Sequence, residues 1–142
     1  MKTILIIIGL LAAGCGAGSN GAATADPCAD FELDVKKVWN AEARIRLSAA
    51  MKEISAGGSA VKEEEVVTKM DDVTRDWVML KQSACNDHFK RGLLSAEEYR
   101  KKADCFDAFL QHVRAMLTAL EKGDGVAADG LMTAPGELDQ CH

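Results

Sequence analysis

Hydrophobic residues recur at helical spacing in three long segments, with polar residues between them. The first segment covers residues 29–55 and ends at Gly57–Gly58, a pair that can take the left-handed conformation of a helix stop. Its repeating apolar positions are Phe31, Val35, Val38, Trp39, Ile45 and Ile54. This pattern predicts one amphipathic helix that covers almost the whole segment.

The second segment begins near residue 59 and ends at Gly92. Its apolar residues follow one another in alternating steps of four and three: Val66, Met70, Val73, Trp77, Leu80 and Ala84. The third segment begins at Ser95, where Ser95 and Glu98 form the sequence pattern of a capping box, and it ends at Gly123. Its predicted core positions are Tyr99, Ala103, Phe106, Leu110, Val113, Leu117 and Leu120.

Short turns between long helices place neighbours antiparallel, so the pattern predicts an all-α, up-down-up three-helix bundle. A fourth helix would arise if the second segment broke near Asp71–Asp72. Residues 124–142 are Gly-rich and show no clear period, which predicts an irregular tail. Aromatic residues make up only 5% of the chain and there are two prolines, a composition that argues against a β-sandwich or barrel.

The first residues have the layout of an export signal. Lys2 precedes the apolar run of residues 4–13, which is too short to span a membrane stably. The segment Leu11-Ala12-Ala13-Gly14-Cys15 resembles the lipobox of bacterial lipoproteins, although that family prefers leucine where this chain has Ala12. An ordinary signal peptide cleaved after Ala23-Thr24-Ala25 is the alternative.

The lipoprotein resemblance implies that Cys15 becomes the N-terminus and carries a diacylglycerol and a further acyl chain, such as palmitate. Gly16 in place of aspartate favours the outer membrane of the bacterial cell envelope over the inner one. The resulting organisation is a signal peptide over 1–14, a lipid-anchored flexible tether over 15–26 and a helical bundle domain with its tail over 27–142.

Cysteine is the residue type with the clearest structural consequence. With Cys15 acylated, four cysteines remain in an exported chain, and they predict two disulfides. Cys85 and Cys105 both lie about 10–14 Å from the turn between the second and third helices. The spacing therefore favours a Cys85–Cys105 bond and leaves Cys28–Cys141 to fasten the tail to the start of the domain.

A metal-binding alternative uses some of the same residues. Cys85 and His88 share a helix face, and the next helix carries Cys105 and His112. Cys141–His142 and the methionines on these two helices would complete a small-ligand or metal carrier; the methionines of the three predicted helices are Met51, Met70, Met79 and Met116. The sequence lacks a paired CxxC or HxxxH motif, and we expect no metal or other cofactor apart from the acyl groups. The methionines are expected to fill gaps in the core.

Other candidates for chemistry are weaker. Glu63–Glu65 and Asp71–Asp72 are expected to form a solvated face, with a divalent-cation site as the alternative, and Trp39 and Trp77 are expected in the core. GxSxG, HExxH, Walker A and GxGxxG motifs are missing from the sequence, so we predict no catalytic residue and no enzyme.

Residues 77–110 carry the order W…AC…G…S…Y…C…L, which resembles a helical segment that precedes tetratricopeptide arrays in some bacterial Ser/Thr kinases. This resemblance implies a helical hairpin with a cysteine pair and no catalytic role. The net charge of -5 argues against nucleic acid as a partner. We therefore expect an envelope lipoprotein whose helical face binds another envelope protein or supports the membrane–wall layer.

Overall fold

The computed structural model describes residues 25–141, and every regular element in that range is helical. The elements are α1 (Phe31–Lys36), α2 (Ala41–Ala56), α3 (Glu63–Phe89), α4 (Ala96–Glu121), α5 (Gly125–Leu138) and the short 3-10 turn η1 (Asp139–Cys141). The predicted all-α class is confirmed for this part of the chain.

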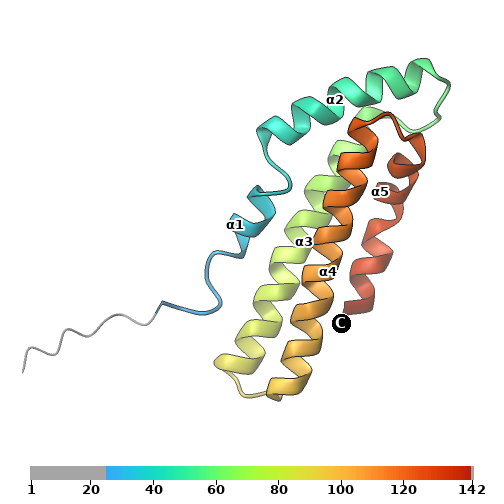
Figure 1. The fold of residues 1–142 in the computed structure, drawn as a ribbon. Coiled ribbons are helices and arrows are strands. Elements are labelled where there is room, and N and C mark those ends of the chain that lie inside the picture. The colour runs from blue at the N-terminus through green and yellow to red at the C-terminus, as the bar shows by residue number, and fades with distance from the viewer. Residues whose placement is uncertain (1–24, 142) are drawn as a thin grey trace, which may run out of the picture.

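The helices α3, α4 and α5 lie side by side, and each runs opposite to the one before it (Figure 1). The shorter α2 crosses the end of the molecule where α3 begins and α4 ends, while α1 lies along α3. An ion pair between Arg46 of α2 and Glu121 of α4 joins the crossing helix to that end, with Nε and Oε1 2.9 Å apart. The expected arrangement, in which the first long helix is one of three aligned members, is therefore not confirmed.

The single helix predicted over 29–55 is wrong, because the chain turns between α1 and α2. Asn40 has an extended backbone, and its side chain accepts a hydrogen bond from the Ala43 amide at 2.9 Å, so it starts a new helix. The new axis also changes which residues reach the core. Ile45 of the predicted stripe is exposed, and the buried residues of α2 are Ala43, Leu47, Ala50 and Met51.

The helices α3 and α4 follow the predicted pattern closely. The α3 helix continues unbroken through Asp71–Asp72, and all of its predicted stripe is buried except Leu80, which is half-buried. In α4 the predicted capping box is confirmed: Ser95 Oγ accepts from the Glu98 amide, and Glu98 Oε2 accepts from the Ser95 amide. The apolar stripe of α4 from Phe106 to Leu120 faces the core.

The irregular tail predicted over 124–142 is also wrong, because most of it forms α5. Gly123 ends α4 with φ 89°, and Asp124 then caps the new helix by accepting from the Val126 amide at 3.0 Å. The face of α5 that packs on the bundle consists mostly of small residues: Ala127, Ala128, Leu131, Ala134 and Leu138. Small side chains allow α5 to approach α4 closely, as at Gly130, where an added Cβ would lie 2.8 Å from Met116 Sδ.

A polar cluster fastens the α1–α2 turn to α3. Asp71 Oδ1 accepts from Trp39 Nε1 at 2.7 Å, and both carboxylate oxygens accept from the Arg44 guanidinium. Burial alone would raise the pKa of Asp71, but the hydrogen bonds from Arg44 and Trp39 outweigh it and hold the pKa below its ordinary value of 3.8. The carboxylate is therefore charged at neutral pH and joins three elements.

Candidate functional site

The two disulfides bring the ends of the described chain against the middle helices. Cys28 is bonded to Cys85 near the end of α3, and Cys105 of α4 is bonded to Cys141 in η1. The predicted presence of two disulfides is confirmed, but the favoured pairing, Cys85–Cys105 with Cys28–Cys141, is wrong. The distance of Cys85 and Cys105 from the turn correctly placed both residues at a similar level along the bundle, but it could not show which way their side chains point. Cys85 points to the N-terminal segment, and Cys105 points to the residues that follow α5.

These bonds remove the thiolates on which the metal alternative depended. His88 Nδ1 lies 2.9 Å from the Leu94 carbonyl, and its ring stacks on Tyr99 with the centroids 4.9 Å apart. The other candidate, His112, lies 3.9 Å from Glu137 on the far side of α4. Within residues 25–141 no three His, Cys, Asp or Glu residues are grouped in a way that could hold a metal ion, and His142 lies outside that range.

The acidic candidates have structural partners. Asp71 belongs to the polar cluster described above, and Asp72 pairs with Arg75 at 2.8 Å. Glu63–Glu65 form the first turn of α3, where carboxylates interact favourably with the positive end of the helix dipole.

The tryptophans and most methionines are core residues, as predicted. Trp39 and Trp77 are both buried, as are Met51, Met70 and Met116. Met79 is the exception, because its side chain is exposed on the outer face of α3.

Lys81 is a buried charge that the sequence pattern did not reveal. Its side chain is only 9% exposed, and its ammonium pairs with Asp107 of α4. The same Nζ lies 4.7 Å from the centroid of the Trp77 ring and 5.2 Å from that of Phe31. The only signal in the sequence is position, because Lys81 falls four residues after Trp77 on the buried face. Through these contacts Lys81 joins α1, α3 and α4.

An apolar groove lies between α2 and α3. It is lined by the apolar residues Ile45, Ala49 and Val67 and by polar residues that we call its rim, Arg44, Ser48, Lys52, Glu53 and Glu63; the volume is about 680 Å³. Ile45 is 70% exposed although it is a large aliphatic residue. We call this feature the α2–α3 groove.

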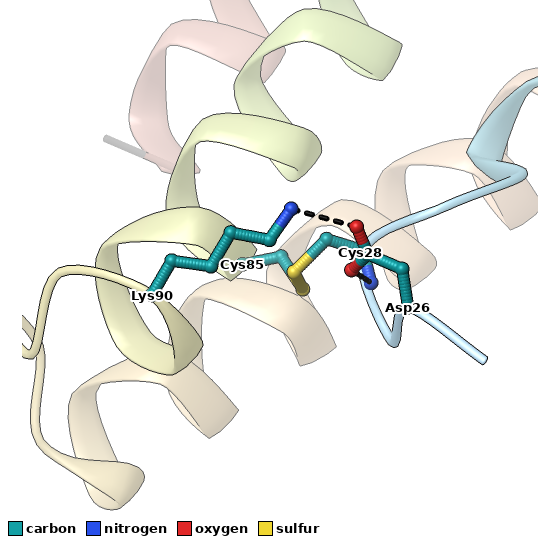
Figure 2. The surroundings of a disulfide bond; sticks show 4 residues. All are labelled: Asp26, Cys28, Cys85 and Lys90. Atoms are coloured by element: carbon teal, nitrogen blue, oxygen red, sulfur yellow. Dashed lines mark hydrogen bonds and ion pairs between the residues drawn. A yellow bond between two sulfur atoms is a disulfide. The ribbon is translucent and has the colours of Figure 1, made fainter. Parts of the chain in front are cut away.

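A second exposed apolar feature lies at the opposite end of the bundle, in the turn between α3 and α4. Phe89 is 52% exposed and Leu93 is 68% exposed, and Lys90 and Arg91 lie between them in the sequence. We call Phe89, Lys90, Arg91 and Leu93 the tether-end surface, because the N-terminal segment meets the bundle there. Figure 2 shows that meeting: Cys28 is bonded to Cys85, and Asp26 faces Lys90.

The Asp26–Lys90 contact orders the chain just before Cys28. Lys90 Nζ donates to Asp26 Oδ2 at 2.7 Å, and the other carboxylate oxygen accepts from the Cys28 amide at 2.9 Å. The hydrogen bond from Lys90, with the one from the Cys28 amide, lowers the pKa of Asp26. The N-terminal segment therefore leaves the bundle at a fixed place, beside the end of α3.

The predicted lipidation site, Cys15, and the signal segment lie outside the described residues. Among residues 25–141, no helix combines the length and apolar character that a membrane crossing requires. Comparison with protein families, characterised proteins and solved structures gives no significant match.

Proposed function

We propose that the protein is a lipid-anchored module of the bacterial envelope, and that it binds another envelope protein through the α2–α3 groove without catalysing a reaction. The lipobox-like segment ending at Cys15 supports the anchor. The two disulfides support export, because such bonds persist in oxidising compartments and are rare in the cytosol. Together they favour an extracytoplasmic domain held at a membrane surface.

The observation that carries the binding role is the exposure of Ile45 in the α2–α3 groove. A single exposed aliphatic residue needs no explanation, but Ile45 lines the groove together with Ala49 and Val67. An apolar groove on a protein surface can accept an amphipathic helix.

Charge at the rim favours one kind of occupant. Glu53, Glu63 and Lys52 of the rim make no ion pair with any other described residue, while Arg44 is already paired with Asp71, so the rim carries more negative than positive unpaired charge. We therefore infer that the occupant is an amphipathic helix of a partner protein, with its apolar side on Ile45 and Ala49 and a lysine or arginine near Glu53 and Glu63.

The anchor is tested by metabolic labelling with a palmitate analogue. The wild-type chain should incorporate the label and sediment with membranes, and the Cys15→Ser variant should do neither. A matched Cys28→Ser/Cys85→Ser variant removes one disulfide and should still be labelled. Labelling that persists in Cys15→Ser would contradict the anchor.

The groove is tested by photo-crosslinking in cells. A photoreactive residue at position 49 should crosslink one partner, and the same residue at position 79, on an exposed part of α3, should not. A synthetic peptide spanning the crosslinked segment should then bind the purified protein directly. Ile45→Glu should weaken that binding about tenfold or more while circular dichroism stays unchanged. Equal crosslinking from both positions, or a peptide that binds Ile45→Glu normally, would refute the proposal.

A further inference from the structure

The tether-end surface presents apolar side chains that the fold holds outward. The Phe89 ring packs edge-on against His88 and Tyr99, with centroid distances of 4.5 and 5.3 Å. Those two rings are stacked on each other, and His88 is fixed by the Leu94 carbonyl. One side of the Phe89 ring therefore packs on His88 and Tyr99, while the rest of the ring is exposed to solvent and does not enter the core.

Basic residues lie close to these apolar side chains in the sequence, at the end of α3 and the start of α4. Residues 87–102 contain five Lys or Arg residues and three carboxylates, and Asp26 adds a fourth carboxylate by pairing with Lys90, whereas the whole chain has 17 basic and 22 acidic residues. Lys90, Arg91, Arg100 and Lys101 are all exposed. Lys90 pairs with Asp26, Arg91 with Asp87 and Lys101 with Glu97, but ion pairs with an exposed cation are weak and leave the cations able to meet an anion. This end of an acidic protein is thus locally positive.

The point where the N-terminal segment joins the bundle gives this surface an orientation. Cys15 and Asp26 are separated by eleven residue steps, which can extend at most about 40 Å, and α3 alone is about 40 Å long. Asp26 touches Lys90 and Cys28 is bonded to Cys85, so an anchor at Cys15 acts on the end of the bundle that carries Phe89 and Leu93 (Figure 2). The α2–α3 groove lies at the other end, because Val67 precedes Phe89 by about 33 Å along the helix.

We propose that the tether-end surface docks on an anionic phospholipid membrane, with Phe89 and Leu93 in the headgroup layer and the neighbouring Lys and Arg side chains against lipid phosphates. This orientation builds on the proposed lipid anchor, which would hold the surface close to the bilayer. Apolar insertion and attraction to anionic lipid reinforce each other at such surfaces.

The test uses the exported chain with Cys15→Ser, so that no acyl group contributes and the result does not depend on the proposed anchor. Vesicles of phosphatidylcholine with and without phosphatidylglycerol are sedimented with the protein. We expect binding only to the anionic vesicles, and loss of that binding in about 1 M NaCl, where the Debye length falls to about 3 Å.

Paired variants locate the surface. Phe89→Ser/Leu93→Ser should weaken anionic-vesicle binding about tenfold or more, and Arg91→Gln/Arg100→Gln should weaken it and flatten its salt dependence. The matched control Ile45→Ser/Val126→Ser removes two exposed aliphatic residues at the opposite end and should bind like the parent chain. Circular dichroism of each variant checks that the bundle remains folded.

Insertion is measured separately with Leu93→Trp, whose fluorescence should be quenched by brominated lipid, in comparison with Val126→Trp, which should not respond. No binding to anionic vesicles, equal binding to neutral vesicles, or binding that survives Phe89→Ser/Leu93→Ser would overturn the proposal. Crosslinking of position 93 to a protein in cells, without vesicle binding, would assign the surface to a protein partner and would equally overturn it.

Discussion

The disulfide connectivity makes a sharp prediction, because it differs from the pairing that helix spacing favours. Cys28–Cys85 closes a loop with a sequence separation of 57 residues, and Cys105–Cys141 one of 36. In the chain-entropy model each bond lowers the free energy of folding by about 4 kcal/mol relative to the reduced chain. We therefore expect Cys28→Ser/Cys85→Ser and Cys105→Ser/Cys141→Ser each to lose about 4 kcal/mol, within the usual range of about 2–5 kcal/mol.

The consequences for structure differ between the two variants. Loss of Cys105–Cys141 frees η1 and the end of α5, but Leu131 and Leu138 still bury their side chains in the core. Loss of Cys28–Cys85 removes the covalent link of the N-terminal segment to α3. Only the Asp26–Lys90 ion pair and the packing of Phe31 against Trp77 then hold this segment on the bundle. Hydrogen exchange should therefore rise in α5 for the first variant and in α1 for the second.

Non-reducing tryptic mapping decides the pairing directly. The structure requires the peptide that ends at Lys36 to be joined to residues 82–90, and residues 103–114 to be joined to 123–142. Equilibrium unfolding in urea then gives the free-energy losses, with Cys15→Ser in every chain so that only these four cysteines count. A peptide joining 82–90 to 103–114 in the native protein would refute the described connectivity and the path of α5 with it.

Three further predictions concern stability. Asp107→Asn leaves the buried Lys81 ammonium without its carboxylate and should cost about 1–3 kcal/mol in urea unfolding, whereas Lys81→Met, which removes the charge at similar volume, should cost less; the reverse order would contradict the account of this pair. Gly136→Ala, in open space within α5, should stabilise by about 0.5–1 kcal/mol, and Gly130→Ala should gain less because Met116 must move; equal melting-temperature gains would show that the close approach is unimportant. Because the pKa of Asp71 is lowered in the folded state, the ionised carboxylate stabilises the fold above about pH 4, and this stabilisation is lost as the pH falls through the folded-state pKa. The difference in unfolding free energy between wild type and Asp71→Asn should therefore shrink below about pH 4. A difference that does not change with pH would refute the role of the Arg44 and Trp39 contacts.

The sequence predicted the parts of the fold that depend on large hydrophobic residues and on local capping. The α3 stripe and the Ser95–Glu98 box are of this kind, and both are confirmed. The α5 helix was missed because it contains three glycines and Pro135, residues that disfavour helices, although small side chains are what allow close packing on α4. The break at Asn40 was missed because apolar residues continue on both sides of it, and only the cap geometry separates the two helices.

The candidate sites were harder to predict, since each depends on where separate elements meet. Ile45 matched the apolar period of the predicted first helix, yet the turn before α2 rotates it out of the core and into the α2–α3 groove. Lys81 lies beside the predicted apolar stripe, four residues after Trp77, but nothing in the sequence indicated that Asp107 and two aromatic rings would surround its ammonium group. The hydrophobic pattern of the sequence indicates where a residue lies along its helix, but the direction of its side chain in the fold also depends on how that helix is oriented against its neighbours.

The Cys28–Cys85 bond links these structural findings to the proposed role. A lipid anchor on an unconstrained segment would leave the domain able to present any face to the membrane. The bond and the Asp26–Lys90 contact instead hold the N-terminal segment beside the α3–α4 turn, so pulling on that segment acts on one end of a helix about 40 Å long. If Cys15 carries the proposed lipid anchor, the Cys28–Cys85 disulfide that stabilises the fold would also orient Phe89 and Leu93 towards the lipid and the α2–α3 groove away from it. Loss of this disulfide in Cys28→Ser/Cys85→Ser should therefore lengthen and loosen the connection without removing the acyl group, and partner crosslinking from position 49 should become less efficient while membrane sedimentation stays the same.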